Sequence, residues 1–311
     1  MNFRVGARGS KLSIAQTDWV ISQLQKTDPS LSFDIKPITT KGDIDTRPLF
    51  AMEQKGIFEK EIDKAVFERE VDFAVHSLKD VPSNLDSDLV ISCVPKREVV
   101  NDVLITRDGF DIEKVPSGFV IGTSSLRRAV QVTRKRPDLI VKPVRGNIET
   151  RIKKIEEGKF DGIVLAHAGI SRLGTNVKFS KLPTNDFLPS PGQGALAIVA
   201  RKDNSNTLEM LKKIEDYNSR MEIEAERALS DSVDSGCRFP VGAVATSDEN
   251  SLTLKVAIYS MDGKKSIILE KTGKINEPKE LGRLLGTELI NRGAKEIASN
   301  WREELEQWNK Q

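Results

Sequence analysis

Apolar and polar positions in the first part of the chain alternate between two periods. Short β-rich runs occur at residues 3–6, 31–39 and 71–75. Between them, at 12–24 and 58–70, apolar residues recur at helical spacing. Strand–helix–strand alternation of this kind implies parallel pairing, so this part of the chain predicts an α/β sheet.

The same pattern starts again near residue 119. Strands are predicted at 119–122, 139–144 and 160–166, and helices at 126–136 and 148–158. Both units share one order: strand, polar loop, helix, and later a strand that contains Asp. We therefore expect two similar, periplasmic-binding-protein-like α/β domains around a cleft, with ligands bound beyond the carboxyl ends of the strands.

Proline and glycine mark the boundaries between these domains. Residues 94–98 read as a first crossing between the units and residues 188–194 as the return, after which 195–199 forms a strand of the first sheet. Beyond residue 217 the pattern changes to a helix, two strands and a long helix near 278–299, which predicts a smaller α+β domain. The predicted domains are 1–96 with 195–216, 97–194, and 217–311.

Composition narrows the class of protein. A chain of 311 residues is too long for one ordinary core, and 38% hydrophobic with 30% charged residues is typical of a globular protein. We find no apolar run of membrane-spanning length and no signal peptide at the N-terminus. Two cysteines without a spacing pattern indicate reduced thiols in the cytoplasm. Because the net charge is only +2, anion binding must depend on local clusters of arginine.

Such clusters follow the predicted strands. Arg127 and Arg128 lie in the first turn of a predicted helix, after a loop of hydroxyl residues that includes Ser125. A helix N-terminus attracts anions and disfavours cations, so the two arginines call for an anion nearby. The alternative is a serine-capped helix with solvated arginines. Further candidates lie in corresponding loops and suit carboxylates or phosphates: Arg8, Ser10, Arg145, Arg151 and Arg172.

Acid–base chemistry is expected to fall to a carboxyl group. The chain has two histidines, and neither belongs to a metal-type cluster, so no metal site is expected. No P-loop and no Gly-x-Gly-x-x-Gly motif follows a strand. Asp80 lies just past the strand 71–75, at the ligand end of the first sheet. Its alternative role is that of a turn residue before Val81 and Pro82.

Cys237 has an unusual setting for a cysteine. It stands between Gly236 and Arg238 and precedes Pro240, which is the composition of a turn. A thiol beside a cation can become a nucleophile or an attachment point, although a cysteine that merely occupies a loop is the alternative.

Several motifs occur together in one order along the chain. They are His-Ser-Leu-Lys-Asp-Val-Pro at 76–82, Gly-Thr-Ser-Ser-Leu-Arg-Arg at 122–128, residues 139–147, Pro-Gly-Gln-Gly-Ala at 191–195 and Ser-Gly-Cys at 235–237. With them the chain resembles the hydroxymethylbilane synthases, also called porphobilinogen deaminases, of tetrapyrrole (haem) biosynthesis. The resemblance runs from Arg8 to at least Gly242.

This resemblance implies a transferase with a covalent cofactor. Cys237 would form a thioether to a dipyrromethane built from two substrate molecules. Four porphobilinogens would be joined to it head to tail with release of ammonia, and hydrolysis would release hydroxymethylbilane. Asp80 would be the central catalytic carboxyl, stabilising cationic intermediates and assisting proton transfers.

The resemblance also implies roles for the other polar residues. The cofactor would be bound by Lys79, Asp80, Ser125, Arg127 and Arg128. The substrate or growing chain would be bound by Arg8, Ser10, Gln16, Arg145, Arg151 and Arg172. Residues 42–56 would be the family's mobile cover. The implied partner is porphobilinogen, with no nucleic acid and no membrane, and the implied state is a monomer.

Three residues depart from the family pattern, and two other functions stay open. Ser235 stands where relatives often have glycine, Arg238 where they often have glutamine, and His167 where most have a small or apolar residue. We interpret His167 as a packed core residue without a role in the site. The other functions are a small-anion binding protein and a ligand-sensing regulator. Both would leave porphobilinogen intact, whereas an enzyme would consume it.

Overall fold

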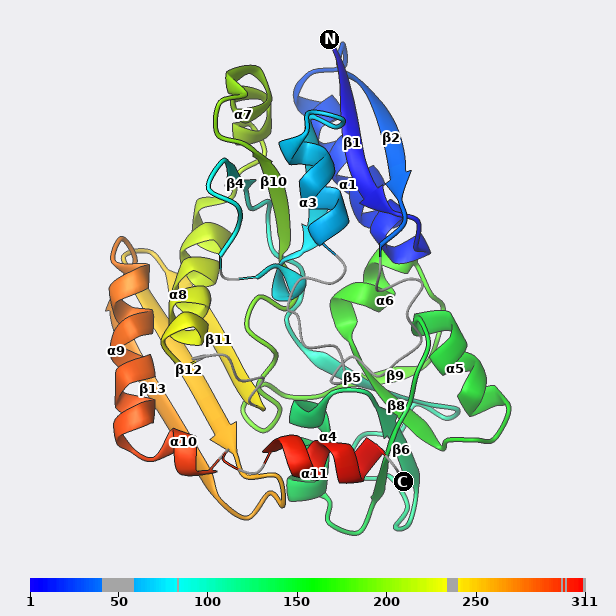
Figure 1. Ribbon diagram of the computed structural model, residues 1–311. Helices are drawn as coiled ribbons and strands as arrows, with labels where there is room; N and C mark the ends of the chain where they lie inside the picture. The colour runs from blue at the N-terminus through cyan, green and yellow to red at the C-terminus, as the bar shows by residue number, and fades with distance from the viewer. Residues whose placement is uncertain (41–58, 83, 234–239, 298, 300, 310–311) are drawn as a thin grey trace. The chain divides into compact units, whose positions relative to one another are not determined.

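The computed structural model describes the chain except residues 41–58, 83, 234–239, 298, 300 and 310–311 (Figure 1). Within the described part, the chain forms two compact units. The first unit comprises Met1–Glu98 and Gly194–Arg220, and the second comprises Val99–Gln193 and Met221–Gln311. The three-domain boundaries drawn from the sequence stay a prediction.

The first unit is built on a mixed five-stranded sheet in the order β2-β1-β3-β10-β4. β1 runs parallel to β2 and β3, whereas β10 runs antiparallel to β3 and β4. The strands are β1 (Asn2–Arg8), β2 (Ser32–Ile38), β3 (Phe73–Ser77), β4 (Leu89–Cys93) and β10 (Leu196–Arg201). The helices are α1 (Lys11–Thr27), α3 (Lys60–Phe67) and α7 (Ser205–Lys212), and a short 3-10 turn, η2 (Leu78–Asp80), follows β3.

Helices cover both faces of this sheet. On one face Leu24 of α1 packs in a cluster with Phe73, and on the other Ile62 of α3 packs in a cluster with Ala74. Successive residues of a strand point to opposite faces, so covering both faces buries consecutive residues, and Phe73, Ala74 and Val75 of β3 are all buried and apolar.

The second unit contains a sheet of the same design, in the order β7-β6-β8-β5-β9. β6 runs parallel to β7 and β8, and β5 runs antiparallel to β8 and β9. The strands are β5 (Asp102–Thr106), β6 (Val120–Thr123), β7 (Ile140–Pro143), β8 (Gly162–Ala166) and β9 (Phe179–Lys181). The helices are α4 (Leu126–Lys135), α5 (Ile148–Glu156) and α6 (His167–Leu173). Each sheet thus has four strands that run in one direction and one antiparallel strand, β10 or β5, that follows a crossing.

A smaller α+β layer completes the second unit. Its antiparallel sheet has the order β11-β12-β13. The strands are β11 (Val241–Asp248), β12 (Ser251–Tyr259) and β13 (Ser266–Lys274), and the helices are α8 (Tyr217–Val233), α9 (Pro278–Asn291), α10 (Ala294–Ile297) and α11 (Trp301–Asn309). These elements confirm the predicted fold class of two similar α/β sheets and a smaller α+β part.

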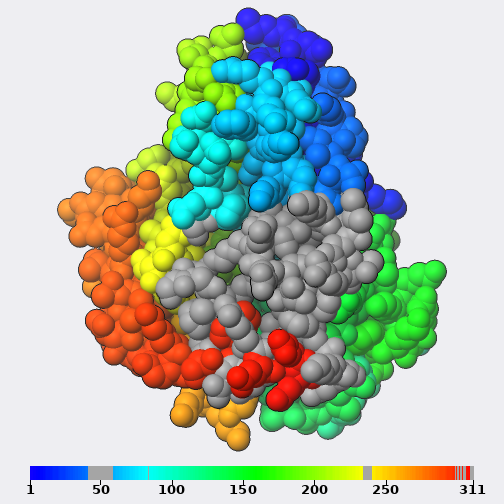
Figure 2. Space-filling model, in the orientation of Figure 1, coloured from blue at the N-terminus to red at the C-terminus, as the bar shows by residue number. Residues whose placement is uncertain are grey.

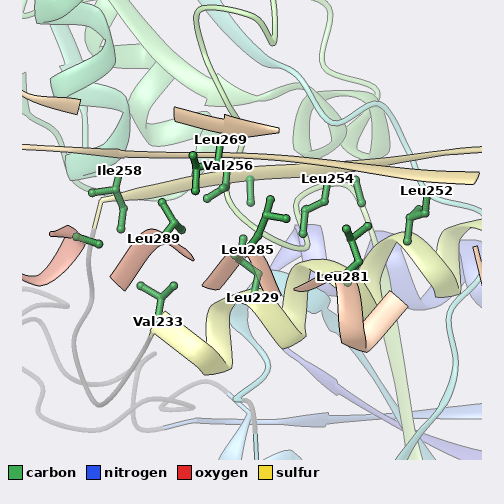
Figure 3. Close-up of a cluster of buried hydrophobic side chains, with 14 residues drawn as sticks. Leu229, Val233, Leu252, Leu254, Val256, Ile258, Leu269, Leu281, Leu285 and Leu289 are labelled. Carbon is green, nitrogen blue, oxygen red and sulfur yellow. The ribbon is translucent and has the colours of Figure 1, made fainter. Parts of the chain in front are cut away.

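The core of this layer lies between the sheet and two helices. Figure 3 shows Leu229 of α8, Leu285 of α9 and Val256 of β12 pointing toward one another. On α9 (orange in Figure 2), Lys279, Glu280 and Arg283 are exposed, whereas Leu281, Leu285 and Leu289 are buried. The helix is therefore amphipathic, as its position requires.

A buried carboxylate joins three segments of the second unit. Glu226 of α8 is fully buried, and its two carboxylate oxygens accept hydrogen bonds from the backbone N–H of Gly192, at 2.6 Å, and of Ala245, at 2.7 Å. The return crossing, α8 and β11 are thus held by one side chain.

The structure corrects two predicted element boundaries. The single helix expected near 278–299 is interrupted: α9 ends at Asn291, and Gly293 adopts φ 90° before α10 begins. A residue at this φ ends a helix, and glycine adopts it without steric cost. The loop expected at Arg8 is in fact strand, because β1 continues to pair with β2 through that residue.

Two glycines allow α8 and α9 to approach closely. A Cβ at Gly282 would lie 2.8 Å from Ala228 Cβ and 2.8 Å from Leu229 N, and closer still to Ala225 O. A Cβ at Gly286 would collide with Ser232 Cβ. We expect Gly282→Ala to destabilise the protein by roughly 1–3 kcal/mol, since a well-packed contact has no room for another carbon.

Chemical denaturation monitored by circular dichroism measures this change. Gly273→Ala is the matched control, because a Cβ there would meet Leu281 at an ordinary 3.4 Å. Equal unfolding free energies for the two variants would contradict the close approach of the helices.

Candidate functional site

The residues singled out in the sequence follow the carboxyl ends of parallel strands. In the first unit Arg8 ends β1, and Asp80 lies in η2 directly after β3. In the second unit Ser125 follows β6, Arg145 follows β7, and Arg172 lies on α6 after β8. Because the strands concerned are parallel, each set gathers at one edge of its own sheet.

Hydrogen bonds fix the loop between β1 and α1. Ser10 is the N-cap of α1, and its Oγ accepts a bond of 3.3 Å from the N–H of Ser13. Ser13 Oγ in turn accepts a bond of 3.1 Å from the N–H of Arg8. Gln16 is buried and donates through Nε2 to Ser77 Oγ at 2.9 Å, which ties α1 to the end of β3. Gln16 therefore supports the turn that presents Asp80.

Buried acidic residues lie near the exposed turn that carries Lys79 and Asp80. The Asp63 carboxylate is 2.9 Å from His76 Nε2, with both side chains largely buried. Glu59, at the start of α3, is only 4% exposed. Burial, and then the charges of Asp80 and Asp63, raise the pKa of Glu59 to about 8.

One buried carboxylate organises the arginines of the second unit. Asp102 is fully buried at the start of β5. Its Oδ2 accepts from Arg127 Nη2 at 2.9 Å, and its Oδ1 accepts from Arg128 Nη2 at 2.8 Å and Nε at 3.0 Å. Gln193 Nε2 also donates to Oδ1, at 2.8 Å. Burial alone would raise the pKa of Asp102, but the two guanidinium groups and the bond from Gln193 lower it to about 2.

The remaining donors of the two arginines also bond to the protein. Arg127 Nη1 donates to the carbonyl of Leu188 and, at 3.1 Å, to Gln131 Oε1. Arg128 Nη2 additionally reaches Gln193 Oε1 at 3.3 Å. Arg127 and Arg128 are 5% and 7% exposed, so the structure gives both a role in packing. Their contact with the cofactor stays a prediction.

Arg151 adds a further positive charge at this edge. Arg151 Nε donates to the carbonyl of Gly146 at 2.7 Å, and among the described residues no carboxylate pairs with its guanidinium. Burial, together with repulsion from Arg128, lowers the pKa of Arg151 to about 10. Nearby, Ser125 caps α4 without a side-chain bond to the helix, and the first turn of α4 contains no acidic residue. This donor set fits a ligand that carries several carboxylates.

The remaining predicted residues complete the picture. His167 begins α6, and its ring packs edge-on against Phe179 with centroids 5.2 Å apart, in line with the packing interpretation. Cys93 is buried, as expected. Cys237 and the loop 42–56 lie outside the described residues.

Neither a metal centre nor a membrane span is found in the described part of the chain. Among these residues no group of three or more His, Cys, Asp or Glu side chains could hold a metal ion. In the same part of the chain, no helix combines the length and the apolar character that crossing a membrane requires.

Sequence reasoning missed Asp102 and Glu59. Asp102 directly precedes the apolar run 103–105, which is the pattern of a buried strand. A carboxylate in such a strand needs a cation as its partner, and this signal could have identified Asp102. Glu59 gave no comparable signal, because acidic residues are common in the first turn of a helix.

Asp102 should be essential for stability. We expect Asp102→Asn to destabilise the protein by about 3–5 kcal/mol, because two buried guanidinium groups would lose their counter-charge. Asp111→Asn removes an exposed ion pair with Lys114 and should cost at most about 1 kcal/mol. Urea unfolding of both variants gives the comparison, and similar midpoints would show that the buried pair is not stabilising.

Comparisons with known proteins cover almost the whole chain. Residues 3–209 match the family model described as "Porphobilinogen deaminase, dipyromethane cofactor binding domain". Residues 220–291 match the model described as "Porphobilinogen deaminase, C-terminal domain". Among solved structures, the methionine binding protein MetQ matches 68% of this chain and 88% of its own at 12% identity, with a TM-score of 0.40, which is too low to argue from.

Curated relatives agree with the family models. The "Probable porphobilinogen deaminase" of Nitrosopumilus maritimus is 64% identical over 310 residues, which cover 100% of both chains. The "Porphobilinogen deaminase" of Desulforudis audaxviator is 44% identical over 96% of this chain and 97% of its own. That of Brevibacillus brevis is 42% identical over 98% of this chain and 99% of its own. On these matches, the chain belongs to the porphobilinogen deaminase family.

Proposed function

We propose that this protein is a hydroxymethylbilane synthase that joins four porphobilinogens head to tail and releases ammonia at each addition. The observation that carries the proposal is the match of both family models, which together span residues 3–209 and 220–291. The structure adds a carboxylate at one sheet edge and a cluster of arginines at another, as this reaction requires.

The arginines suit the charge of the substrate. Each pyrrole of porphobilinogen carries an acetate and a propionate, so a growing chain accumulates negative charge. Arg151, whose pKa is lowered by burial and by Arg128, gains most from a bound carboxylate, and the exposed side chain of Arg145 lies at the same sheet edge. We assign substrate binding to Arg8, Ser10, Gln16, Arg145, Arg151 and Arg172.

Cys237 is assigned as the attachment site of the dipyrromethane. When attached, this cofactor supplies the pyrrole carbon to which substrate is joined. We assign the binding of its carboxylates to Lys79, Ser125, Arg127 and Arg128. Asp102 holds the guanidinium groups of both arginines in place, so these side chains do not have to be ordered when an anion binds.

Asp80 acts as the catalytic carboxylate. Its side chain is exposed at the end of β3, where it can reach a bound ligand. A carboxylate there stabilises positive charge that develops on the substrate pyrrole as the amine leaves, and it can hold or move a proton at that nitrogen.

Mass spectrometry of the intact protein tests the attachment. We expect an excess equal to two porphobilinogens less two ammonias, mapped to the peptide that contains Cys237. The Cys237→Ala variant should show the bare mass and consume no porphobilinogen. A wild-type chain that stays bare after incubation with porphobilinogen would refute the attachment and favour a binding protein.

Removal of the Asp80 charge tests the catalytic role. Asp80→Asn keeps the shape of the side chain, so we expect turnover to fall by at least about 100-fold while the unfolding midpoint stays near that of the wild type. Asp34→Asn, at an exposed position of β2, is the control and should keep full turnover. Near-normal turnover of Asp80→Asn would remove Asp80 from the mechanism.

The proposal extends to the state of the protein in the cell. We infer a monomer in the cytoplasm that binds no nucleic acid. Light scattering of the purified protein, with and without porphobilinogen, measures the oligomeric state.

A further inference from the structure

Glu59 is a buried acid beside the turn that carries Asp80. It is 4% exposed, and it begins α3 without a side-chain bond to the helix N-terminus. Glu59 borders a cavity of about 610 Å³, whose wall also includes Asp63 and Pro82. A carboxyl placed there is largely removed from water yet keeps a route for a proton to leave.

Charges of both signs surround Glu59, and the two that raise its pKa most are negative. Asp80 acts on it from η2 and Asp63 from its own helix, while Arg8 of β1 is the opposing cation. His76 of β3 contacts Asp63 at 2.9 Å. The cavity wall adds two lysines and one more aspartate: Lys60, Lys64 and Asp86. An ionised Glu59 would therefore be a desolvated charge beside two others of the same sign.

We propose that Glu59, buried beside the turn that carries Asp80, keeps its proton at neutral pH and so adds no second charge next to the catalytic carboxylate. Glu59 is thus a positioning residue that acts through Asp80. This inference rests on the proposed function, since it concerns the carboxylate assigned to catalysis.

The two environments explain which carboxyl keeps the proton. Asp80 is exposed and Glu59 is not; burial, and then the charges of Asp80 and Asp63, raise the pKa of Glu59 to about 8. Two carboxyls in unlike environments divide their protonation states in this way.

Ionisation of Glu59 should then oppose the reaction. Above about pH 8 its proton passes to water, and a second negative charge appears beside Asp80. The substrate itself carries carboxylates, so this charge repels it and lowers the rate of productive binding. Ionisation of Glu59 should therefore lower the activity at alkaline pH, and a neutral residue at position 59 should remove this loss.

The pH profile of kcat/KM tests the proposal. For the wild type we expect a loss that approaches tenfold per pH unit above about pH 8. In Glu59→Gln this limb should disappear or move upward by at least one unit, because glutamine is permanently neutral. Glu68→Gln is the control: it changes an exposed glutamate at the end of α3 and should keep the alkaline fall of the wild type. The same limb in Glu59→Gln and in the wild type would overturn the proposal.

Thermal unfolding provides a readout that does not need activity. A raised pKa means that the native state holds its proton more tightly than the unfolded chain. The stability from protonated Glu59 is present in full below its ordinary value of 4.5 and is lost as the pH rises through about 8. The Tm of Glu59→Gln relative to the wild type should therefore rise between pH 5 and pH 9.

The two measurements separate the two proposals. A Tm difference that is constant across this range would overturn the proton on Glu59, whether or not the protein is active. A wild type that consumes no porphobilinogen at any pH would instead refute the proposed function, while the unfolding data would still report the protonation of Glu59.

Discussion

The second unit depends on the pairing of one buried carboxylate with two arginine forks. Asp102, Arg127 and Arg128 are all buried, and none of them could be placed there alone, because an unpaired charge in the interior is costly. Gln193 donates to Asp102 and also to the carbonyl of Val100, so the pair is joined to the chain where it enters and leaves this unit. The bonds of Gln193 therefore connect the arginine cluster to both ends of residues 99–193, where the chain passes between the two units.

This arrangement separates two uses of positive charge within one short segment. Arg127 and Arg128 share the charge of Asp102, and Arg127 also donates to the carbonyl of Leu188, whereas Arg151 has no carboxylate partner in the described part of the chain. Burial, and then repulsion from Arg128, lowers the pKa of Arg151 to about 10. Since one carboxylate faces two guanidinium groups, this edge of the sheet keeps a net positive charge.

The periodic parts of the fold could be predicted from the sequence, and the parts that depend on distant partners could not. The strands β1, β3, β6 and β8 are buried by helices on both faces and read as apolar runs, so their existence followed from composition. β4, β5, β9 and β11 were not predicted, and which strands lie beside one another, such as β5 beside β8, was not visible in the sequence pattern either. In the same way Arg127 could be named as a candidate, but its partner Asp102 lies 25 residues earlier, and only the fold brings the two together. Loop residues such as Asp80 could be identified because they follow a recognisable strand. The raised pKa of Glu59 depends on its burial, which the sequence does not show.

The carboxylate of Glu226 has a consequence for the freedom of motion around residue 237. It holds Gly192, α8 and the backbone of β11 at Ala245 together, and α8 ends at Val233 while β11 begins at Val241. Both ends of the intervening segment are therefore anchored to a common frame, and an extended chain gains only about 3.5 Å of reach with each residue. If a cofactor is attached at Cys237, as proposed, its attachment point stays within chain reach of these two anchored ends, and it is the free end of a lengthening pyrrole chain that has to move.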